Sequence, residues 1–298
     1  MGLFLTILIC LISKEFCVQF CQDYKYANNN FSRRFGDMIL SLKERNALIC
    51  GSTQGIGLAT AKELALSGAN CILLARNETS LQQAISLLDV SQGQQHEYAV
   101  ADFSNNQQVK TAIEKIVQLK TVHILINNTG GPAPGAITDA TAENFNNAFQ
   151  QHIINNQILV QAVLPGMRAA GFGRIINIIS TSVKIPIPNL GVSNTIRAAT
   201  AGWAKTLSLE VAAYGITVNN ILPGYTKTLR LDSLITTNAA KQNITKEELA
   251  EEMEREIPAR RFGEAQEIAA VAAFFASPAA SYVNGTSIPV DGGRTGAF

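Results

Sequence analysis

Short apolar runs alternate along the chain with longer stretches in which apolar residues recur three and four positions apart. The runs predict buried strands, and the stretches predict helices with one apolar face. Strands are predicted at residues 47–50, 70–75, 97–101, 123–128, 174–179, 217–222 and 286–290. Helices are predicted at residues 58–66, 78–88, 107–119, 142–170 and 194–214. Continuous apolar strands separated by amphipathic helices indicate one α/β domain, a doubly wound parallel sheet of seven strands with helices on both faces.

A glycine-rich turn follows the first predicted strand. Gly51, Gly55 and Gly57 stand between the apolar run 47–50 and the helix 58–66. Glycines allow a tight turn and a close approach of ligand to backbone. The start of the helix directs free N–H groups and the positive end of its dipole at the ligand. The pattern therefore predicts a nucleotide site, with further site residues directly after the other strands.

The charge balance excludes one class of partner. The 298 residues include 24 Lys or Arg and 23 Asp or Glu. Such a balance argues against nucleic acid, or a membrane surface, as a partner held by charge. Cys50 and Cys71 lie in predicted strands and are interpreted as small buried hydrophobic residues. No cysteine pair has zinc-site spacing, so we expect no metal and a reducing compartment, the cytoplasm.

The first 37 residues differ in character from the rest of the chain. Leu3–Ile12 is apolar but too short to span a bilayer, and no Lys or Arg precedes it. We expect residues 1–37 to be a disordered extension, or Met38 to be the true start, with the folded domain at residues 38–298. A membrane-directing segment is the alternative.

Motifs at the ends of the strands occur in a familiar order. They are Gly51-Ser52-Thr53-Gln54-Gly55-Ile56-Gly57, Asp102, Asn127-Asn128-Thr129-Gly130, Pro223-Gly224 and Val290-Asp291-Gly292-Gly293. With these motifs, residues 45–293 resemble the short-chain dehydrogenase/reductases, and in particular their 3-oxoacyl-ACP reductase-like members. The resemblance implies a Rossmann-type fold and an NAD(P)-dependent oxidoreductase that reduces a carbonyl substrate, 3-oxoacyl-like, by hydride transfer.

The resemblance also implies which residues hold the cofactor. They are Gly51, Ser52, Thr53, Gly55, Ile56, Gly57, Arg76, Asp102, Phe103, Asn128, Thr129, Gly130, Arg197, Pro223, Gly224 and Thr226. Arg76 follows the second strand, where a guanidinium suits the 2′-phosphate of NADP(H) and an acidic residue would suit NAD(H). We expect NADP(H) to be preferred and NAD(H) to be possible; a solvated arginine near a helix start is the alternative.

The reacting centre departs from the family. Relatives use a Ser, a Tyr thirteen residues later, a Lys four further on, and an Asn from the preceding helix. Here Ser180 is retained, but Ser193, Arg197 and His152 occupy the other three positions. An aliphatic hydroxyl is a poor acid and a guanidinium keeps its protons, whereas His152 can titrate near neutral pH and donate through a water or Ser180. Alternatively, His152 is a helix residue at a packing contact, and Tyr225 is another candidate donor.

Two functions therefore stay open. One is a reductase with atypical proton delivery, acting on a small-molecule carbonyl or acyl-thioester substrate. The other is a catalytically inactive protein of the same fold that binds NADP(H) or serves as a scaffold.

A substrate lid is predicted at residues 226–256, in which Thr245 and Glu248 form a capping box at the start of a helix. Its apolar residues line a pocket or form the core of the lid; they are Leu229, Leu231, Leu234 and Ile235. The helices at 142–170 and 194–214 are apolar on more than one face, which predicts a homotetramer.

Overall fold

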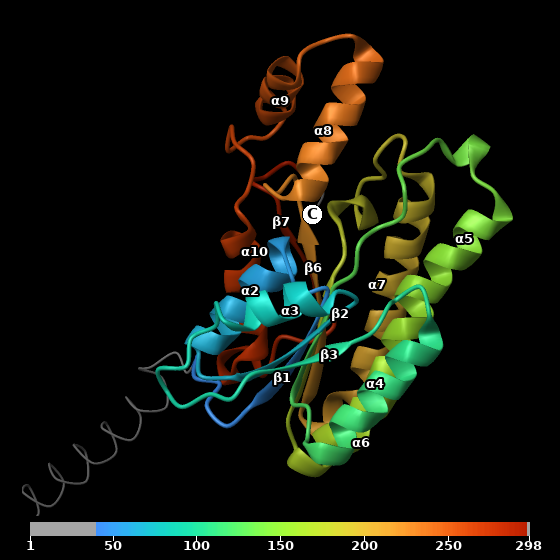
Figure 1. Ribbon diagram of the computed structural model, residues 1–298. Coiled ribbons are helices and arrows are strands. Elements are labelled where there is room, and N and C mark those ends of the chain that lie inside the picture. The colour runs from blue at the N-terminus through green and yellow to red at the C-terminus, as the bar shows by residue number, and fades with distance from the viewer. Residues whose placement is uncertain (1–39, 297–298) are drawn as a thin grey trace, which may run out of the picture. The chain divides into compact units, whose positions relative to one another are not determined.

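The computed structural model describes residues 40–296, and a seven-stranded sheet runs through its centre (Figure 1). The strands are β1 Asn46–Cys50, β2 Asn70–Ala75, β3 Glu97–Val100, β4 Ile124–Asn127, β5 Gly173–Ile178, β6 Ile216–Pro223 and β7 Ser287–Val290. All neighbours pair in parallel, in the order β3-β2-β1-β4-β5-β6-β7. The predicted fold class is confirmed. Strand order reverses between β1 and β4, where folds of this kind bind their ligands.

Helices cover both faces of the sheet. They are α2 Gly55–Leu66, α3 Glu78–Ile85, α4 Asn106–Leu119, α5 Ala142–Phe149, α6 Asn155–Ala170, α7 Gly191–Val211, α8 Leu229–Gln242, α9 Lys246–Arg255 and α10 Ala265–Ala276. One apolar layer joins the sheet to α2, α3 and α10, and the other joins it to α4, α6 and α7. Successive residues of β1 show the alternation, since Leu48 packs in the second layer and Ile49 in the first.

The predicted helix 142–170 is interrupted. A π-helical turn, Gln150–Ile154, lies between α5 and α6 and contains His152. A single π turn inserts one residue into the winding, which the spacing of apolar residues does not reveal, and such turns are frequent at functional sites. Helices α8 and α10 were not among the predicted elements.

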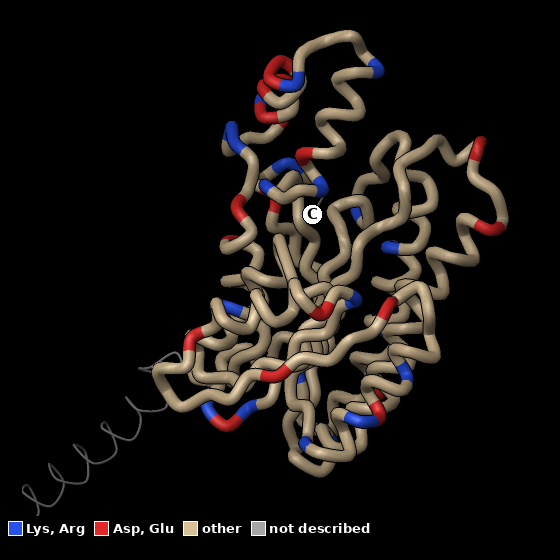
Figure 2. Tube along the Cα trace, viewed as in Figure 1, with Lys and Arg blue, Asp and Glu red and all other residues tan. Residues whose placement is uncertain are grey.

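The lid consists of α8 and α9, which extend beyond the carboxyl edge of the sheet (Figure 1). The predicted capping box is present: Glu248 N donates to Thr245 Oγ1 at 3.1 Å and Thr245 N to Glu248 Oε2 at 2.8 Å. Figure 2 shows α9 carrying charges of both signs. The lid has a small core of its own, formed mainly by Leu231, Ile235, Ala239, Leu249, Met253, Ile257 and Phe262.

Residues 1–37 lie outside the described part of the chain, so the expectations for them stay predictions. Within residues 40–296, no helix combines the length and apolar character needed to cross a membrane. Among the described residues the packed structure begins at Leu42, which is fully buried and whose N–H donates to Ser67 O at 2.7 Å.

Candidate functional site

The glycine-rich turn has the conformation that its glycines permit. Gly51 and Gly55 have φ of +58° and +54°, in the left-handed region that favours glycine. At Gly57 the constraint is space, because a Cβ there would lie 2.1 Å from Gly51 O. Gln54, which precedes α2, makes no side-chain capping bond, so it leaves the first N–H groups of the helix for a ligand. These features fit a bound diphosphate.

Asn128 ties this turn to the end of β4. Its Nδ2 donates to Cys50 O at 3.2 Å and to Gly51 O at 3.1 Å. A Cβ on Gly51 would lie only 2.5 Å from Asn128 O, so the two strand ends pack backbone against backbone. Burial raises the pKa of the Cys50 thiol, which agrees with its interpretation as a buried hydrophobic residue.

A cleft of about 520 Å³ runs past the carboxyl ends of β1 to β4. Most of the predicted cofactor residues line it, namely Gly51, Thr53, Gly55, Ile56, Arg76, Asp102, Phe103, Asn128, Thr129 and Gly130. Asp102 accepts a hydrogen bond from Ser104 N at 2.8 Å, and this bond, together with the charge of Arg76, lowers the pKa of its carboxyl. Arg76 is exposed, so its guanidinium is accessible at the end of the cleft that is formed by β2 and β3.

Two predicted cofactor residues, Gly57 and Ser52, line neither this cleft nor the cavity that adjoins it. Gly57 serves packing between α2 and the turn. Ser52 is fully buried, and among the described residues its hydroxyl has no hydrogen-bond partner.

A second cavity, of about 200 Å³, adjoins the cleft beneath the lid. Asn128 and Thr129 line both spaces, which makes one continuous site. The remaining predicted residues that line it are Ser180, Arg197, Pro223, Gly224 and Thr226.

Ser180 and Arg197 are held by main-chain groups. Ser180 caps the short turn Thr181–Val183, and its Oγ accepts from Ser182 N at 3.0 Å. Arg197, on α7, donates to Ile178 O at 3.0 Å and to Thr129 O at 3.4 Å. Burial, and secondarily the charge of Arg230, lowers the pKa of Arg197 to about 10, so the guanidinium remains charged at neutral pH.

His152 reaches the cavity only through Thr129. Its Nδ1 lies 2.7 Å from Thr129 Oγ1, and Nε2 has no partner among the described residues. Burial, followed by the charges of Arg197 and Arg230, lowers the pKa of His152 to about 3. The expectation that His152 titrates near neutral pH is therefore wrong. Ser193 is also buried and is not among the residues that line the cavity.

Residues 51–295 match the family model described as enoyl-(acyl carrier protein) reductase. The chain belongs to the short-chain dehydrogenase/reductase family. The NADPH-dependent reductase BacG of Bacillus subtilis is 31% identical over 254 residues, which cover 85% of this chain and 98% of that protein. The 3-oxoacyl-[acyl-carrier-protein] reductase FabG of Haemophilus influenzae is 34% identical, covering 83% and 96%.

A solved structure is similar over the same region. L-Sorbose reductase from Gluconobacter frateurii, complexed with NADPH and L-sorbose, superimposes with a TM-score of 0.82 at 28% identity, covering 87% of this chain and 99% of that one. The present short-chain dehydrogenase/reductase thus shares the family fold over almost all of its described residues.

Sequence reasoning missed two residues of this short-chain dehydrogenase/reductase. Arg230 and Thr228 line both the cleft and the cavity. Arg230 Nη1 and Nη2 donate to Gly131 O at 3.0 Å and Pro132 O at 3.2 Å, joining α8 to the loop after β4. Thr228 caps α8 by accepting from Leu231 N at 3.3 Å. In the sequence, Arg230 stands between two leucines and follows the capping residue Thr228, and this pattern could have indicated both residues.

The apolar residues of the lid divide between the two predicted roles. Leu231 and Ile235 belong to the lid core, and Leu231 and Leu234 also line the cavity. Tyr225 lines the cavity as well, but its hydroxyl accepts from Arg294 at 3.1 Å and its ring packs edge-on against Phe262. Burial raises the pKa of Tyr225, so its contacts favour packing over proton donation.

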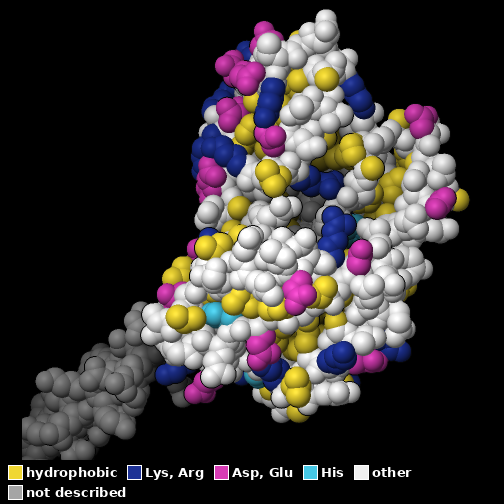
Figure 3. All heavy atoms as spheres, in the orientation of Figure 1, with side chains coloured by type: hydrophobic (Ala, Val, Ile, Leu, Met, Phe, Trp, Pro, Cys, Tyr) yellow, Lys and Arg dark blue, Asp and Glu magenta, His cyan; other side chains and the backbone are white. Residues whose placement is uncertain are grey.

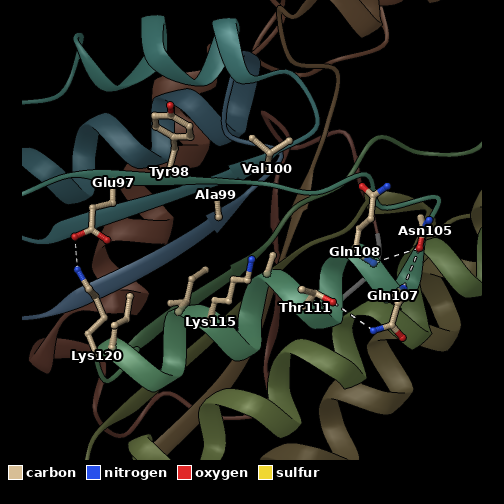
Figure 4. A pocket seen from close by; sticks show the side chains of 13 residues that line it. Glu97, Tyr98, Ala99, Val100, Asn105, Gln107, Gln108, Thr111, Lys115 and Lys120 are labelled. Atoms are coloured by element: carbon tan, nitrogen blue, oxygen red, sulfur yellow. Dashed lines mark hydrogen bonds and ion pairs between the residues drawn. The ribbon is translucent and has the colours of Figure 1, made fainter.

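Another hollow, of about 550 Å³, lies between β3 and α4 at the edge of the sheet (Figure 4). It contains none of the predicted site residues, and Lys120 pairs with Glu97 at one end. Its position at an edge strand, away from the switch point between β1 and β4, separates it from the nucleotide site.

Proposed function

We propose that this chain is an NADPH-dependent reductase of a carbonyl compound, with an atypical route for the proton. The supporting observation is the continuity of the site: Asn128 and Thr129 line both the cleft that begins at Arg76 and the cavity that contains Ser180. A nicotinamide cofactor spans such a distance, with its adenine end and its reactive end in different parts of one groove.

Each part of the site suits one part of NADPH. Arg76 would pair with the 2′-phosphate, and the uncapped start of α2 would bind the diphosphate. Arg197 would hold the nicotinamide ribose, and Pro223 and Gly224 would lie against the ring. The proposed preference for NADP(H) over NAD(H) rests on Arg76. Two similar proteins support it: BacG is named as an NADPH-dependent reductase, and the L-sorbose reductase was solved in complex with NADPH.

When bound, the reduced cofactor supplies the hydride to the carbonyl carbon. Ser180 Oγ accepts from Ser182 N, which leaves its own O–H free to donate to the carbonyl oxygen of the substrate. The charge of Arg197 stabilises negative charge as it develops on that oxygen. Both groups are fixed by main-chain contacts before substrate binds, so little reorganisation accompanies the reaction.

The proton donor is a water beside Ser180 and Thr129. Ser193 lies outside the cavity, Arg197 stays charged, and His152 is neutral above a pKa of about 3. His152 is a positioning residue, because its Nδ1 holds the Thr129 hydroxyl and Thr129 is the group that faces the cavity. The neutral imidazole acts through this contact and not as an imidazolium acid.

The substrate is a small carbonyl compound, for which a 3-oxoacyl group is the model suggested by the FabG relative. Leu231 and Leu234 give the cavity an apolar wall beneath the lid. Such a wall binds the alkyl part of a substrate, while Ser180 binds its oxygen.

Turnover by the purified protein tests the proposal. NADPH oxidation is followed with a panel of ketones, oxo acids and 3-oxoacyl thioesters. Ser180→Ala is expected to lower kcat/KM by roughly 10² to 10³, the range for loss of one hydrogen-bond donor to a developing oxyanion, while NADPH affinity stays within a few-fold. Ser281→Ala, an exposed serine outside both spaces, is the matched control. A parent rate that survives in Ser180→Ala would contradict this mechanism.

A non-catalytic NADP(H)-binding protein is the second candidate. The observation that favours it is that Ser193, the residue at the family's tyrosine position, is buried outside the cavity. The double variant Ser193→Tyr with Arg197→Lys distinguishes the two. A parent that binds NADPH without turnover, and a double variant that reduces carbonyl compounds, would establish the second candidate.

A further inference from the structure

Among residues 40–296, only two charged side chains line the cavity at Ser180, and both are arginines. They are Arg197 from α7 and Arg230 from the first turn of α8. Within the described part of the chain, no Asp or Glu is among the lining residues. Figure 3 shows Lys or Arg side chains, in dark blue, within the hollow beneath α8. The cavity is therefore positively charged on two sides.

Neither arginine is neutralised by a carboxylate among residues 40–296. Arg197, only 8% exposed, donates to the carbonyl oxygens of Ile178 and Thr129. Arg230 donates to the carbonyl oxygens of Gly131 and Pro132, and it is exposed at the mouth of the cavity. Salt bridges within this part of the chain involve other residues. A buried cation without a counter-ion is costly, and an anion in the cavity would offset that cost.

The two charges also act on each other. The charge of Arg230 contributes, after burial, to the lowered pKa of Arg197, and both charges contribute to the lowered pKa of His152. Repulsion of this kind is relieved when an anion binds between the cations.

The N–H donors of Arg197 and Arg230 that make no contact with the main chain suit a carboxylate. A guanidinium has five N–H donors in a plane, and the contacts described occupy two on each arginine. The remaining donors can bind two carboxylate oxygens in parallel. The cavity, at about 200 Å³, is smaller than the roughly 300 Å³ from which drug-sized pockets begin, and the nicotinamide would occupy part of it, so the substrate is small.

The phosphates of the cofactor have other donors. Arg76 and the start of α2 line the cleft, Arg230 lines both the cleft and the cavity, and Arg197 lines only the cavity at Ser180. An anion for Arg197 must therefore come from the substrate side.

We propose that the substrate is a small free oxo acid, whose carboxylate is bound by Arg230 with the charge of Arg197 beneath it, while its carbonyl lies at Ser180. This inference rests on the proposed reductase function and narrows its substrate class from carbonyl compounds in general to 2-oxo and 3-oxo acids.

Paired probes test it on the full chain saturated with NADPH. 2-Oxobutyrate and 3-oxobutyrate are compared with their methyl esters, and 3-oxobutyrate also with its N-acetylcysteamine thioester. Binding is read from the quenching of NADPH fluorescence, and turnover is read from NADPH oxidation. At least one acid is expected to bind on the order of tenfold more tightly than its ester, the scale of one charge-assisted hydrogen bond. Arg230→Met should remove that ratio, whereas Arg255→Met, on the far helix of the lid, should keep it.

Each outcome separates this inference from the proposed function. Equal binding of acid and ester, or no binding of either acid, overturns the oxo-acid inference. Turnover of an ester or thioester without preference for the acid also overturns it, but leaves the proposed reductase function standing. Tight binding of an acid without NADPH oxidation supports the carboxylate site and contradicts the reductase. A loss of NADPH affinity in Arg230→Met, with the acid-to-ester ratio unchanged, shows that Arg230 pairs with the cofactor and also overturns the inference.

Discussion

Thr129 Oγ1 lies 2.7 Å from Nδ1 of His152, and this contact joins the end of β4 to the π-helical turn Gln150–Ile154. Thr129 faces the site, whereas His152 is buried behind it. The lowered pKa of His152, about 3 against an ordinary 6.5, means that the folded protein holds a neutral imidazole. A neutral buried histidine couples stability to pH.

The free energy of unfolding should fall in mild acid. The unfolded chain protonates His152 below about pH 6.5, whereas the folded chain does so only near pH 3, so the contribution is complete above pH 6.5 and is lost as pH decreases. Between pH 7 and pH 5 the loss is about 2 kcal/mol. Urea unfolding at both pH values should show that His152→Asn lacks this part of the slope. Equal slopes for parent and variant would contradict the buried neutral imidazole.

Cofactor preference should depend on Arg76. Arg76→Glu removes the partner of the 2′-phosphate and adds repulsion, so we expect the NADPH dissociation constant to rise roughly 10- to 100-fold while that for NADH changes little. Fluorescence titration of both cofactors measures this. Lys115→Glu, a charge reversal in the hollow of Figure 4, is the control and should leave both constants unchanged. Equal affinities of the parent for the two cofactors would refute the preference.

The packing of α2 on the glycine turn should not tolerate a methyl group at Gly57. A Cβ there would meet Gly51 O at 2.1 Å and Asn128 Nδ2 at 2.7 Å. Gly57→Ala is therefore expected to destabilise the protein by about 3 kcal/mol and to weaken NADPH binding. Gly135→Ala, where a Cβ meets nothing within 4 Å, should change stability by no more than about 0.5 kcal/mol. Calorimetry measures the two changes in stability, and a cofactor titration measures NADPH binding. A Gly57→Ala variant as stable as the parent, or a strongly destabilised Gly135→Ala variant, would contradict this account.

The homotetramer remains a prediction. The prediction rests on the helices at 142–170 and 194–214, where Leu159 and Val211 are buried within the chain, whereas Leu209 on α7 is 70% exposed. Light scattering at micromolar concentration should give four chains, and Leu209→Lys should dissociate them because a charge would enter an apolar contact. Leu119→Lys, on α4 and 80% exposed, should leave the assembly intact. A monomeric parent would disprove the assembly.

A chain that begins at Met38 should fold and bind NADPH as the full chain does. It retains Leu42, whose burial and contact with Ser67 O mark the start of the packed structure among the described residues. Denaturation midpoints and NADPH dissociation constants of the two chains should agree within error. Insolubility, or a weaker affinity, of the shorter chain would mean that residues before Met38 support the domain.

The sheet and its nucleotide end were determined by the sequence alone. Apolar runs such as 70–75 are readable because a strand buried on both faces needs an apolar side chain at nearly every position. The glycine turn is equally readable, because its backbone geometry demands glycine at particular distances from a strand, and the place of Arg76 at the cleft follows from its position directly after β2.

Tertiary structure alone decided the surroundings of the side chains near Ser180. The pKa of His152 depends on its burial and on Arg197 and Arg230, which are distant from it in sequence. Whether Ser193 faces the cavity depends on how α7 packs, and the role of Arg230 depends on the lid bringing α8 beside the loop at Gly131. Local spacing determines elements and turns, whereas desolvation and charge coupling arise only when separate elements meet in space.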